Sequence, residues 1–504
     1  MSQIFLDHLA EKYVAIGVTI WLLTFAAVVW RRPAQSKIPE FGGESAEVLQ
    51  DVVKKQWSQV RQTIYRLRLP FRRIYVLPHK YINEYVWKPD NQISSNTDLQ
   101  ERLLGRWTYI GSLTPDDPDG PYSWVVAYVR SELTKQISFY LPAIQKDISA
   151  HFEAHVLPDT ENGKSTVGVH DFCIALCFSL YQRIFVGEDL AKDPEWKAAC
   201  VDLGLSSVGV AGSLMRVPVW LRPIAANFMK GPRDVKANVR RMEDKIRPLV
   251  KTRIESMRKD SFVPPRDFIQ WWIQKSTSAG RRPDDVSALV VALIQLNFAG
   301  IRSTGLAVMQ SLIDIAVHPE YTQELREELQ QARSVVEQEE LSVASLAKLE
   351  KMDSFIKESA RHVSQNVLSV YRKALRPLHL SDGTVLPASS YICVPSIDPD
   401  ADPETAARPF DGFRWWRQRN EQPDQSARYL SVSTNPQALE FGAGSHACPG
   451  RFLAVAVIKT ALAHAITHLD LKLPDAQKPQ EPQYNHVLVY TPDTKQEIEF
   501  VRRP

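Results

Sequence analysis

Hydrophobic residues recur every three or four positions over most of the chain, the spacing that places them on one face of an α-helix. Two short runs, at 71–78 and 378–395, predict strands instead, and Asp382-Gly383 predicts a turn inside the second run. The pattern therefore predicts a mainly α-helical fold with small β-sheets. The clearest helices are expected at 133–154, 235–257, 285–317 and 318–336.

The longest of these segments, 285–317, contains no proline and follows Pro283. Asp284 or Asp285 can accept the free backbone N–H groups of its first turn. Its centre, F-A-G-I-R-S-T-G at 298–305, is unusual for a buried helix because glycines and hydroxyl residues gather there. A hydroxyl can bond the carbonyl oxygen one turn earlier and open the helix locally. Small residues can equally form a notch for a neighbouring helix.

The N-terminus carries 18 residues without a charge, at 13–30. As a helix this run spans about 27 Å, close to the thickness of the endoplasmic reticulum bilayer. Arg31, Arg32 and Lys37 follow it, so the positive-inside rule places the rest of the chain in the cytosol. A cleaved signal peptide would need a basic region before a shorter apolar core, and a buried core helix is the other alternative. The pattern favours an uncleaved single-pass anchor.

The chain is accordingly expected to have three parts: a membrane anchor at 1–32, a hinge and entry segment at 33–69, and one large domain at 70–504. Proline and glycine mark the hinge at 39–43, and no Ser/Gly-rich linker or internal repeat divides the remainder. With 504 residues, 44% of them hydrophobic, the chain is long enough to bury a large core.

Charge and cysteine content exclude several classes of function. The net charge is only +3 and no basic stripe stands out, which argues against nucleic-acid binding. The five cysteines form no Cys-x-x-Cys pair. Their odd number and spacing speak against a disulfide framework and a zinc site, and fit a reducing compartment.

Cys448 is the residue that the sequence singles out for chemistry. It lies in a glycine-rich turn, F-G-A-G-S-H-A-C-P-G-R-F at 441–452, that leads into an apolar helix. The positive end of the helix dipole and its free N–H groups favour thiolate over thiol. Gly442, Gly444 and Gly450 allow unusual dihedral angles and the close approach of a flat ligand. A thiolate on such a loop suits an axial ligand of haem iron.

Two other interpretations of this loop compete. A cysteine without context is often a small buried hydrophobe. The stretch G-A-G-S-H-A at 442–447 also imitates a dinucleotide-binding fingerprint, which needs a strand before it and a helix after it. Pro436 leaves little room for the strand, and Pro449 would interrupt the helix. The full flanks favour haem ligation.

With these flanks, the loop resembles the haem-binding loop of the cytochrome P450 superfamily, in the form common among fungal membrane-bound members of secondary metabolism. Weaker motifs occur in that family's order from about residue 70 to the C-terminus. The resemblance implies the cytochrome P450 fold and haem b, with Cys448 as the axial ligand of the iron. The other matching cofactor positions are Phe441, Gly442, His446, Gly450 and Arg372.

Within that set, the resemblance implies that Phe441 packs against the haem and the cysteine sulfur. His446 and Arg372 would bond haem propionates, a task suited to the guanidinium fork of an arginine. An unattached loop histidine is the plainer interpretation of His446. One family landmark, Trp-x-x-x-Arg in an early helix, is not seen; Trp124 and Arg130 lie near its place at a different spacing.

The centre of the long predicted helix occupies the place of the family's oxygen-binding groove, which usually reads Ala/Gly-Gly-x-acid-Thr. Ala299 and Gly300 match this pattern and would border the cofactor, and Ser303 takes the threonine position. Arg302 replaces the acid. The resemblance implies that Ser303 and Thr304 relay protons, because Arg302 keeps its charge at neutral pH. Arg302 could instead hold the water chain or bind a substrate carbonyl or carboxylate.

Glu358 and Arg361 share one face of a predicted helix at 352–361, a spacing that alone indicates an ordinary surface ion pair. In the resembled family, this Glu-x-x-Arg pair locks the core behind the haem, and an arginine from the segment before the cysteine loop joins it. Arg414, in R-P-F-D-G-F-R-W at 408–415, is the candidate. An aromatic-rich surface loop is the alternative for that segment.

The resemblance implies a monooxygenase that inserts one atom of O₂ into an apolar natural product, such as a terpenoid, an indole alkaloid or a related polycycle. Electrons would come from NADPH through a separate NADPH-cytochrome P450 reductase at the endoplasmic reticulum membrane, with cytochrome b5 as a further candidate partner. Two alternatives stay open. One is a haem-thiolate enzyme that rearranges its substrate without NADPH, motivated by Arg302, and the other is a non-catalytic membrane haem-binding protein.

Overall fold

The computed structural model describes residues 38–42, 62–69, 72–111, 120–156, 163–334, 340–396, 409–436, 438–474, 483–484 and 489–503. The chain divides into two units, 1–40 and 41–504, and nearly all described residues belong to the second. The anchor predicted at 13–30 lies outside the described residues.

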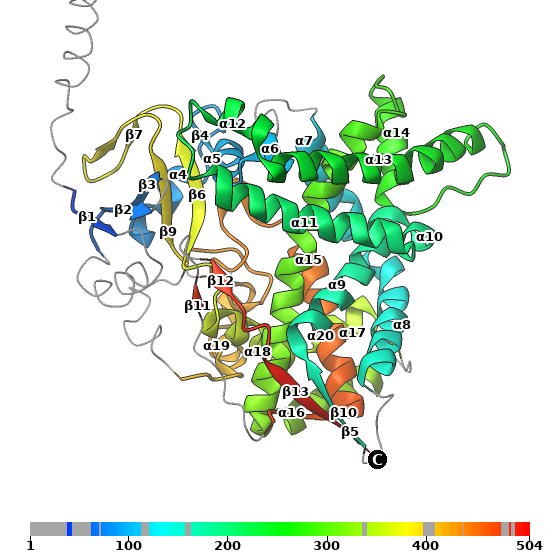
Figure 1. Cartoon of the computed structure of the whole chain (residues 1–504). Helices are drawn as coiled ribbons and strands as arrows, with labels where there is room; N and C mark the ends of the chain where they lie inside the picture. Colours follow the sequence, from blue (N-terminus) through cyan, green and yellow to red (C-terminus); the bar gives the residue numbers. More distant parts are fainter. Residues whose placement is uncertain are drawn as a thin grey trace, which may run out of the picture. The chain divides into compact units, whose positions relative to one another are not determined.

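Helices make up most of the described chain (Figure 1). In chain order the helices, with short 3₁₀ and π segments marked η, are η1 His79–Tyr81, α4 Ile82–Tyr85, α5 Ser95–Arg102, α6 Gly105–Thr108, α7 Pro121–Ala127, η2 Tyr128–Leu133, α8 Ile137–Val156, α9 Val169–Val186, α10 Glu188–Ala191, α11 Pro194–Leu214, α12 Arg222–Phe228, α13 Lys230–Ser256, α14 Phe268–Ser278, α15 Val286–Val317, η3 Pro319–Tyr321, α16 Thr322–Ser334, α17 Val343–Lys348, α18 Glu350–His362, α19 Arg414–Glu421, η4 Pro423–Tyr429, η5 Gly444–His446 and α20 Arg451–His468.

The strands form one larger sheet and three small ones. The larger sheet has the order β1-β2-β3-β9-β6-β4, and the small ones are β10-β13-β5, β11-β12 and β7-β8. The strands are β1 Glu40–Gly42, β2 Tyr65–Leu69, β3 Arg72–Val76, β4 Ile93–Ser94, β5 Lys164–Gly168, β6 Leu368–Ala374, β7 Leu378–His379, β8 Val385–Leu386, β9 Tyr391–Pro395, β10 Leu469–Lys472, β11 Gln483–Tyr484, β12 Tyr490–Thr491 and β13 Glu497–Arg502.

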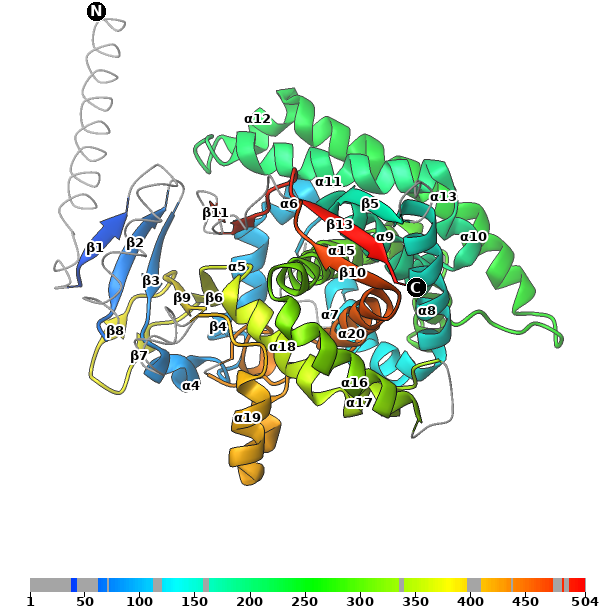
Figure 2. The ribbon, with the colours of Figure 1, turned by 90° about the horizontal axis from the view of Figure 1, so that it is seen from below.

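Helix α15 forms the centre of the helical part. It packs against α9, α20, α13, α7 and α18, and Figure 2 shows it enclosed by these helices and by β10 and β13. Apolar residues such as Leu289, Leu293 and Leu312 are fully buried along it. The Asp285 side chain caps the helix by accepting the Ala288 N–H at 3.1 Å. Helix α15 is therefore a firmly packed element at the centre of the fold, and its residues can hold a site in place.

The predicted elements are present with shifted ends. The helices expected at 133–154, 235–257, 285–317 and 318–336 correspond to α8, α13, α15 and η3 with α16, and the predicted strand runs contain β3, β7, β8 and β9. The hinge prediction is wrong at its C-terminal end. Tyr65–Leu69 forms β2, which pairs in antiparallel register with β3, because Tyr65, Leu67 and Leu69 are all buried in the sheet core.

Two helices in the described part of the chain, α9 and α15, are long and apolar enough to cross a membrane by length and composition alone. Their most apolar windows are 67% and 50% buried inside the protein. Both are core helices of the large unit, since each packs against several neighbours.

Asp314, near the end of α15, is a buried carboxyl that links this helix to α18. It accepts hydrogen bonds from the Ser359 hydroxyl and from Gln310 Nε2, the latter at 2.9 Å. Burial raises the pKa of Asp314 from its ordinary value of 3.8 to about 7, and the hydrogen bonds offset this only in part. The folded protein therefore holds a proton here that the unfolded chain releases near pH 4.

Asp314→Asn is expected to become increasingly stabilising, relative to wild type, as the pH rises. A carboxyl with a raised pKa in the folded state costs folding free energy as the pH climbs from about 4 to about 7, and no further cost arises above that. The measurement is the difference in melting temperature between the variant and wild type at pH 5, 6, 7 and 8. The difference isolates Asp314, because buried His151 and His464, whose pKa values burial lowers to about 4, produce the opposite slope in both proteins. A constant difference across this range would contradict the prediction.

Candidate active site

The cysteine loop is shaped by two glycines and by its contact with α4. Gly442 and Gly444 have φ angles of +70° and +73°, which L-residues rarely adopt. A Cβ on Gly444 would lie 2.5 Å from Val86 Cβ, so the loop approaches this residue more closely than any side chain allows. Ser445 Oγ also donates to the Val86 carbonyl at 3.1 Å. Gly444 therefore makes a close approach to the protein itself, whereas Gly450, with φ −89°, has no unusual dihedral angle. The predicted close approach of a flat ligand stays a prediction.

Cys448 lies shortly before helix α20, which begins at Arg451. Its own N–H donates to the Phe441 carbonyl at 2.8 Å, which closes the turn. Burial raises the pKa of Cys448, while the N–H groups of Gly450 and Arg451 and the charge of Arg451 only partly offset this. The helix end therefore favours the thiolate as expected, but desolvation is the larger effect on the pKa of Cys448, and ligation of a metal would displace the proton.

Cys448 does not belong to a metal site made of protein ligands alone. No three His, Cys, Asp or Glu side chains come together as metal ligands within the described ranges. A single soft sulfur ligand suits the axial position of a prosthetic group whose other iron ligands come from the group itself. The chemistry of the donor set therefore fits haem.

Arg372 lies on β6, buried, beside this loop. Its guanidinium donates to the carbonyls of Tyr371 at 2.8 Å and Ala443 at 3.5 Å, and no described carboxylate pairs with it. Burial lowers the pKa of Arg372, although nearby acidic groups oppose the shift. A buried cation without a carboxylate is costly unless an anion binds it. The position therefore fits a haem propionate.

A strained residue sets the direction of Arg372. Val370 has φ +53°, a conformation that a β-branched residue rarely adopts. The pairing of β6 with β9 shifts register between Ser369 and Arg372, so the strand bulges at this place. Tyr85 Oη donates to the Val370 carbonyl at 3.2 Å and supports the bulge. The bulge re-aims the strand, which puts the Arg372 guanidinium against the cysteine loop.

His446 has a protein partner, which neither interpretation of it anticipated. Its Nε2 lies 2.7 Å from Asp90 Oδ1, in an ion pair when the imidazole is protonated. Arg130, on the π-helical segment η2, donates to the Ser445 carbonyl at 3.3 Å from an exposed position. Both residues therefore have protein partners at the cysteine loop. Neither is a buried cation without a described carboxylate partner, as Arg372 is.

Sequence reasoning missed two tyrosines in this region. Burial raises the pKa of Tyr122, which lies within electrostatic range of Asp90 and Arg372. Tyr85 is fully enclosed beside Arg372, and burial raises its pKa as well. The only sequence signal for Tyr122 was its position shortly before Trp124, in the segment where the family usually carries the Trp-x-x-x-Arg motif.

The middle of α15 presents one face to open space although both ends of the helix are buried. Phe298, Ala299, Arg302 and Ser303 are exposed and share one arc of the helix. Ser303 Oγ donates to the Ala299 carbonyl at 2.7 Å, as a hydroxyl in this place was expected to do, yet the helix is continuous. These four residues in the centre of a core helix are therefore accessible to a ligand.

Gly300 and Thr304 face the opposite way. A Cβ on Gly300 would meet the Tyr181 ring of α9 at 3.3 Å, and Thr304 Oγ1 shares a hydrogen bond of 2.9 Å with Tyr181 Oη. Thr304 is 3% exposed. Gly300 thus packs closely against α9, as the helix-packing alternative expected, and the Thr304 hydroxyl bonds a core tyrosine. The roles predicted for both residues in the site stay predictions.

Glu358 is fully buried, and its carboxylate accepts hydrogen bonds from donors in different segments of the chain. Arg361 donates to its two carboxylate oxygens at 2.7 and 2.9 Å, and Arg414 approaches Oε1 at 3.4 Å. The Asp411 N–H at 3.1 Å and the Trp415 indole N–H at 3.1 Å complete the set. The three residues expected to act together do meet, and Trp415 is a member that the sequence did not reveal.

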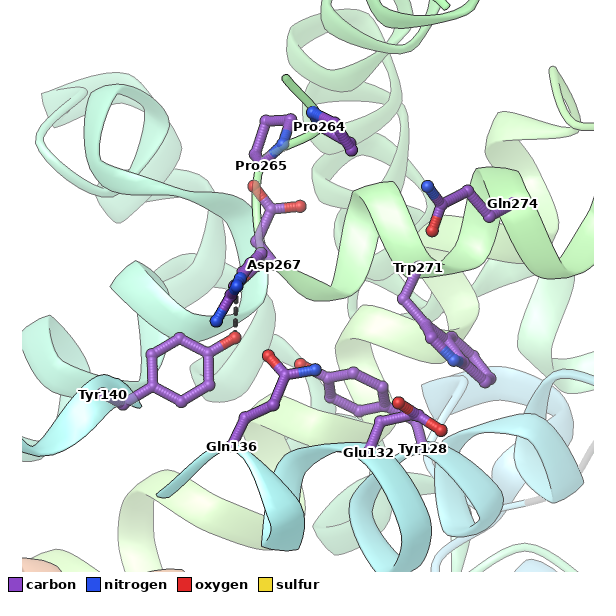
Figure 3. A pocket seen from close by; sticks show the side chains of 10 residues that line it. Tyr128, Glu132, Gln136, Tyr140, Pro264, Pro265, Asp267, Trp271 and Gln274 are labelled. Carbon is purple, nitrogen blue, oxygen red and sulfur yellow. Dashed lines mark hydrogen bonds between the residues drawn. The ribbon is translucent and has the colours of Figure 1, made fainter. Parts of the chain in front are cut away.

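A separate hollow of about 200 Å³ lies on another part of the molecule (Figure 3). In it the Tyr140 hydroxyl donates to the Arg266 carbonyl. It shares no lining residue with the cysteine loop or with the exposed face of α15, so it does not belong to this site. Its lining residues are Tyr128, Glu132, Gln136, Tyr140, Pro264, Pro265, Arg266, Asp267, Trp271 and Gln274.

Comparison with known proteins identifies the family. The family model described as Cytochrome P450 matches residues 131–500. The chain is 29% identical over 457 residues to cytochrome P450 monooxygenase BOA4 of Botryotinia fuckeliana (90% of this chain, 89% of the relative), and 27% identical over 483 residues to cytochrome P450 monooxygenase prx8 of Penicillium rubens (93% and 88%).

A solved structure, retinoic acid bound cyanobacterial CYP120A1, superposes with a TM-score of 0.66 at 16% identity, over 92% of this chain and 99% of that one. The likeness shows the shared fold. The chain belongs to the cytochrome P450 family and is a monooxygenase of the fungal type, and this family membership implies a haem-thiolate cofactor.

Cys448→Ala is expected to abolish the red-shifted Soret band that thiolate ligation gives the reduced carbon monoxide complex, because alanine cannot ligate iron. The matched control is Cys393→Ala, which removes a fully buried thiol on β9. The control should keep the band while lowering the melting temperature, since it leaves a cavity in the sheet core. An unchanged spectrum in Cys448→Ala would refute the assignment of this ligand.

Proposed function

We propose that this monooxygenase oxidises a lipophilic natural product in secondary metabolism, with electrons from NADPH delivered by a separate NADPH-cytochrome P450 reductase at the endoplasmic reticulum membrane. The observation that carries the proposal is the accessible face of α15, which combines Phe298 and Ala299 with the polar Arg302 and Ser303. An apolar lining with few polar groups is typical of a site for a lipophilic ligand. The names of the fungal relatives, all monooxygenases, point to the same class of reaction.

The residues on the cysteine side would hold the cofactor. Cys448 would supply the thiolate ligand to iron, with the N–H groups of Gly450 and Arg451 directed at its sulfur. Arg372 would pair with a propionate, which offsets the cost of its burial. Bound haem supplies the activation of O₂; the protein positions the substrate and controls access of water and protons.

Proton delivery would fall to Ser303. Its hydroxyl lies on the accessible face and donates to the Ala299 carbonyl, so its lone pairs can accept from water, and it can pass a proton to a ligand once it releases that bond. Arg302 cannot exchange a proton at neutral pH, and Thr304 is held by Tyr181. In this proposal Ser303 relays the proton and Thr304 does not, although the sequence suggested both.

Ser303→Ala is expected to raise the hydrogen peroxide released per NADPH consumed several-fold, because the accessible hydroxyl for proton transfer is lost. Thr304→Val is the matched control: it should leave coupling near the wild-type value and lower the melting temperature, since it leaves the buried Tyr181 hydroxyl unpaired. The measurement is NADPH, peroxide and product stoichiometry with the purified reductase. Equal coupling in Ser303→Ala and wild type, or uncoupling in Thr304→Val alone, would contradict this division of roles.

Membrane attachment is supported by a second feature besides the N-terminal apolar run. Val219, Trp220, Ile224 and Phe228, in and just before α12, are 71%, 75%, 58% and 78% exposed. We call these four residues the α12 patch. Exposed apolar side chains gathered in one short segment mark an interaction surface, and aromatic residues favour the bilayer interface. We propose that the patch rests on the same membrane that the 13–30 segment crosses.

Deletion of residues 1–32 is expected to weaken membrane binding but to leave a measurable bound fraction. Adding Trp220→Asp and Phe228→Asp should release that fraction, because the change removes apolar surface that would be buried in the bilayer and puts costly carboxylates in its place. The measurement is co-sedimentation with liposomes of endoplasmic reticulum composition at high salt. The control is Val263→Asp in the same truncated chain, since Val263 is 85% exposed elsewhere. Equal binding of the patch variant and the control would remove the α12 patch from the proposal.

A further inference from the structure

Arg302 has one hydrogen-bond partner within the described chain, and the partner is uncharged. Its Nη2 donates to the Tyr490 main-chain carbonyl at 3.0 Å. The guanidinium atoms Nε and Nη1 make no hydrogen bond to any residue that the structure describes, and no described carboxylate pairs with it. A guanidinium offers five N–H donors, so most of its binding capacity is directed elsewhere.

The surroundings of Arg302 are largely protein even though its side chain has accessible surface. Enclosure lowers the pKa of Arg302, and the nearby Tyr490 only partly opposes this; the group remains a cation at neutral pH. Arg302 keeps accessible surface, so it is partly enclosed rather than removed from water, and a bound anion would pair with it at this surface. Arg253, which is more deeply buried, already pairs with the Asp267 carboxylate at 2.6 Å.

The position of Arg302 is fixed from two sides. The Gln365 amide donates to the Ser303 carbonyl at 2.8 Å, and the Tyr490 N–H donates to the Gln365 carbonyl at 2.9 Å. The segment after α18 and strand β12 are thereby tied to the centre of α15. Arg302 is held at the edge of the accessible face, next to Phe298 and one residue before Ser303. Its charge is thus preorganised rather than free to leave the site.

Arg302 and Arg372 contact different parts of the chain. Arg372 is buried against the cysteine loop through the Ala443 carbonyl, whereas Arg302 is attached to β12. If Arg372 takes a haem propionate, Arg302 remains as a second cation on the side where the substrate would lie. Its neighbours on the helix, Phe298 and Ala299, are apolar, so the ligand that fits this face combines a hydrophobic body with one anionic group.

We propose that Arg302 recognises a carboxylate on a lipophilic substrate and so selects carboxylic acids over their neutral derivatives. This inference rests on the proposed function, because it assigns a substrate class to the same site. A carboxylate matches the planar fork of a guanidinium and is ionised at neutral pH. The proposal makes Arg302 a specificity residue that binds substrate, with no part in proton transfer.

The test uses the full-length haem-loaded enzyme and two matched pairs of ligands: abietic acid with its methyl ester, and dodecanoic acid with its methyl ester. Dissociation constants are measured from the substrate-induced spin shift and independently by calorimetry. Wild type is expected to bind at least one acid about 10- to 100-fold more tightly than its ester, the range for a charge-assisted hydrogen-bonded pair. Arg302→Gln should reduce the ratio to about one by weakening the acid alone, and Arg302→Lys should keep part of it.

Arg240→Gln is the control, because it removes an equal charge from an exposed position on α13. It should leave the preference for the acid unchanged. Equal binding of acids and esters by wild type in both pairs, or an acid preference that survives in Arg302→Gln, would overturn the proposal. Loss of haem from Arg302→Gln would overturn it too, since that result assigns the arginine to the cofactor. If esters bind and turn over while acids gain nothing, the monooxygenase function stands and only the carboxylate assignment fails.

Discussion

The buried carboxylate of Glu358 is the constraint on which the region behind the site depends. An ionised carboxylate without exposure to water is tolerated only if donors surround it. Here Arg361 comes from the same helix, while Arg414, Trp415 and the Asp411 N–H come from a segment more than 50 residues later in the chain. Satisfying one charge therefore fixes where that later segment must lie. The cysteine loop comes after it in the chain, beyond α19 and η4, so these contacts fix one end of the stretch that leads to the thiol.

The centre of α15 shows how one helix divides its faces between structure and function. Gly300 and Thr304 occupy the side that meets Tyr181, and Arg302 and Ser303 occupy the accessible side. Helical periodicity puts residues three and four apart on one face, so the sequence already separated these two pairs. It did not say which pair faces α9, because that depends on the packing partner. The motif order suggested that all four served the site, and the structure adds that Gly300 and Thr304 also pack against Tyr181 of α9.

The sequence predicted the architecture well because its signals were local. Apolar spacing located α15 and its cap, and the order of motifs located Cys448 and the Glu358 cluster. Some of its errors came from contacts between distant segments. The partner of His446 is Asp90, 356 residues away, and β2 was missed although Y-R-L-R-L at 65–69 alternates apolar and polar residues, because the five residues stand just before the expected start of the large domain. The desolvation that raises the pKa of Cys448 is likewise a property of the folded environment, which no spacing of residues records.

The strain at Val370 links the stability of the sheet to retention of the cofactor. This β-branched residue is held at φ +53° by the bulge between β6 and β9, and the same bulge directs Arg372. A bound anion that pairs with Arg372 stabilises the strained arrangement by mass action, and by thermodynamic reciprocity the arrangement strengthens the binding of that anion. The first measurable effect of a destabilising substitution in the sheet core, for example at Leu67 or Ile74, would therefore be a lower affinity for haem. If Arg372 binds a haem propionate as proposed, the conformational stability of this sheet would contribute to the affinity for the prosthetic group.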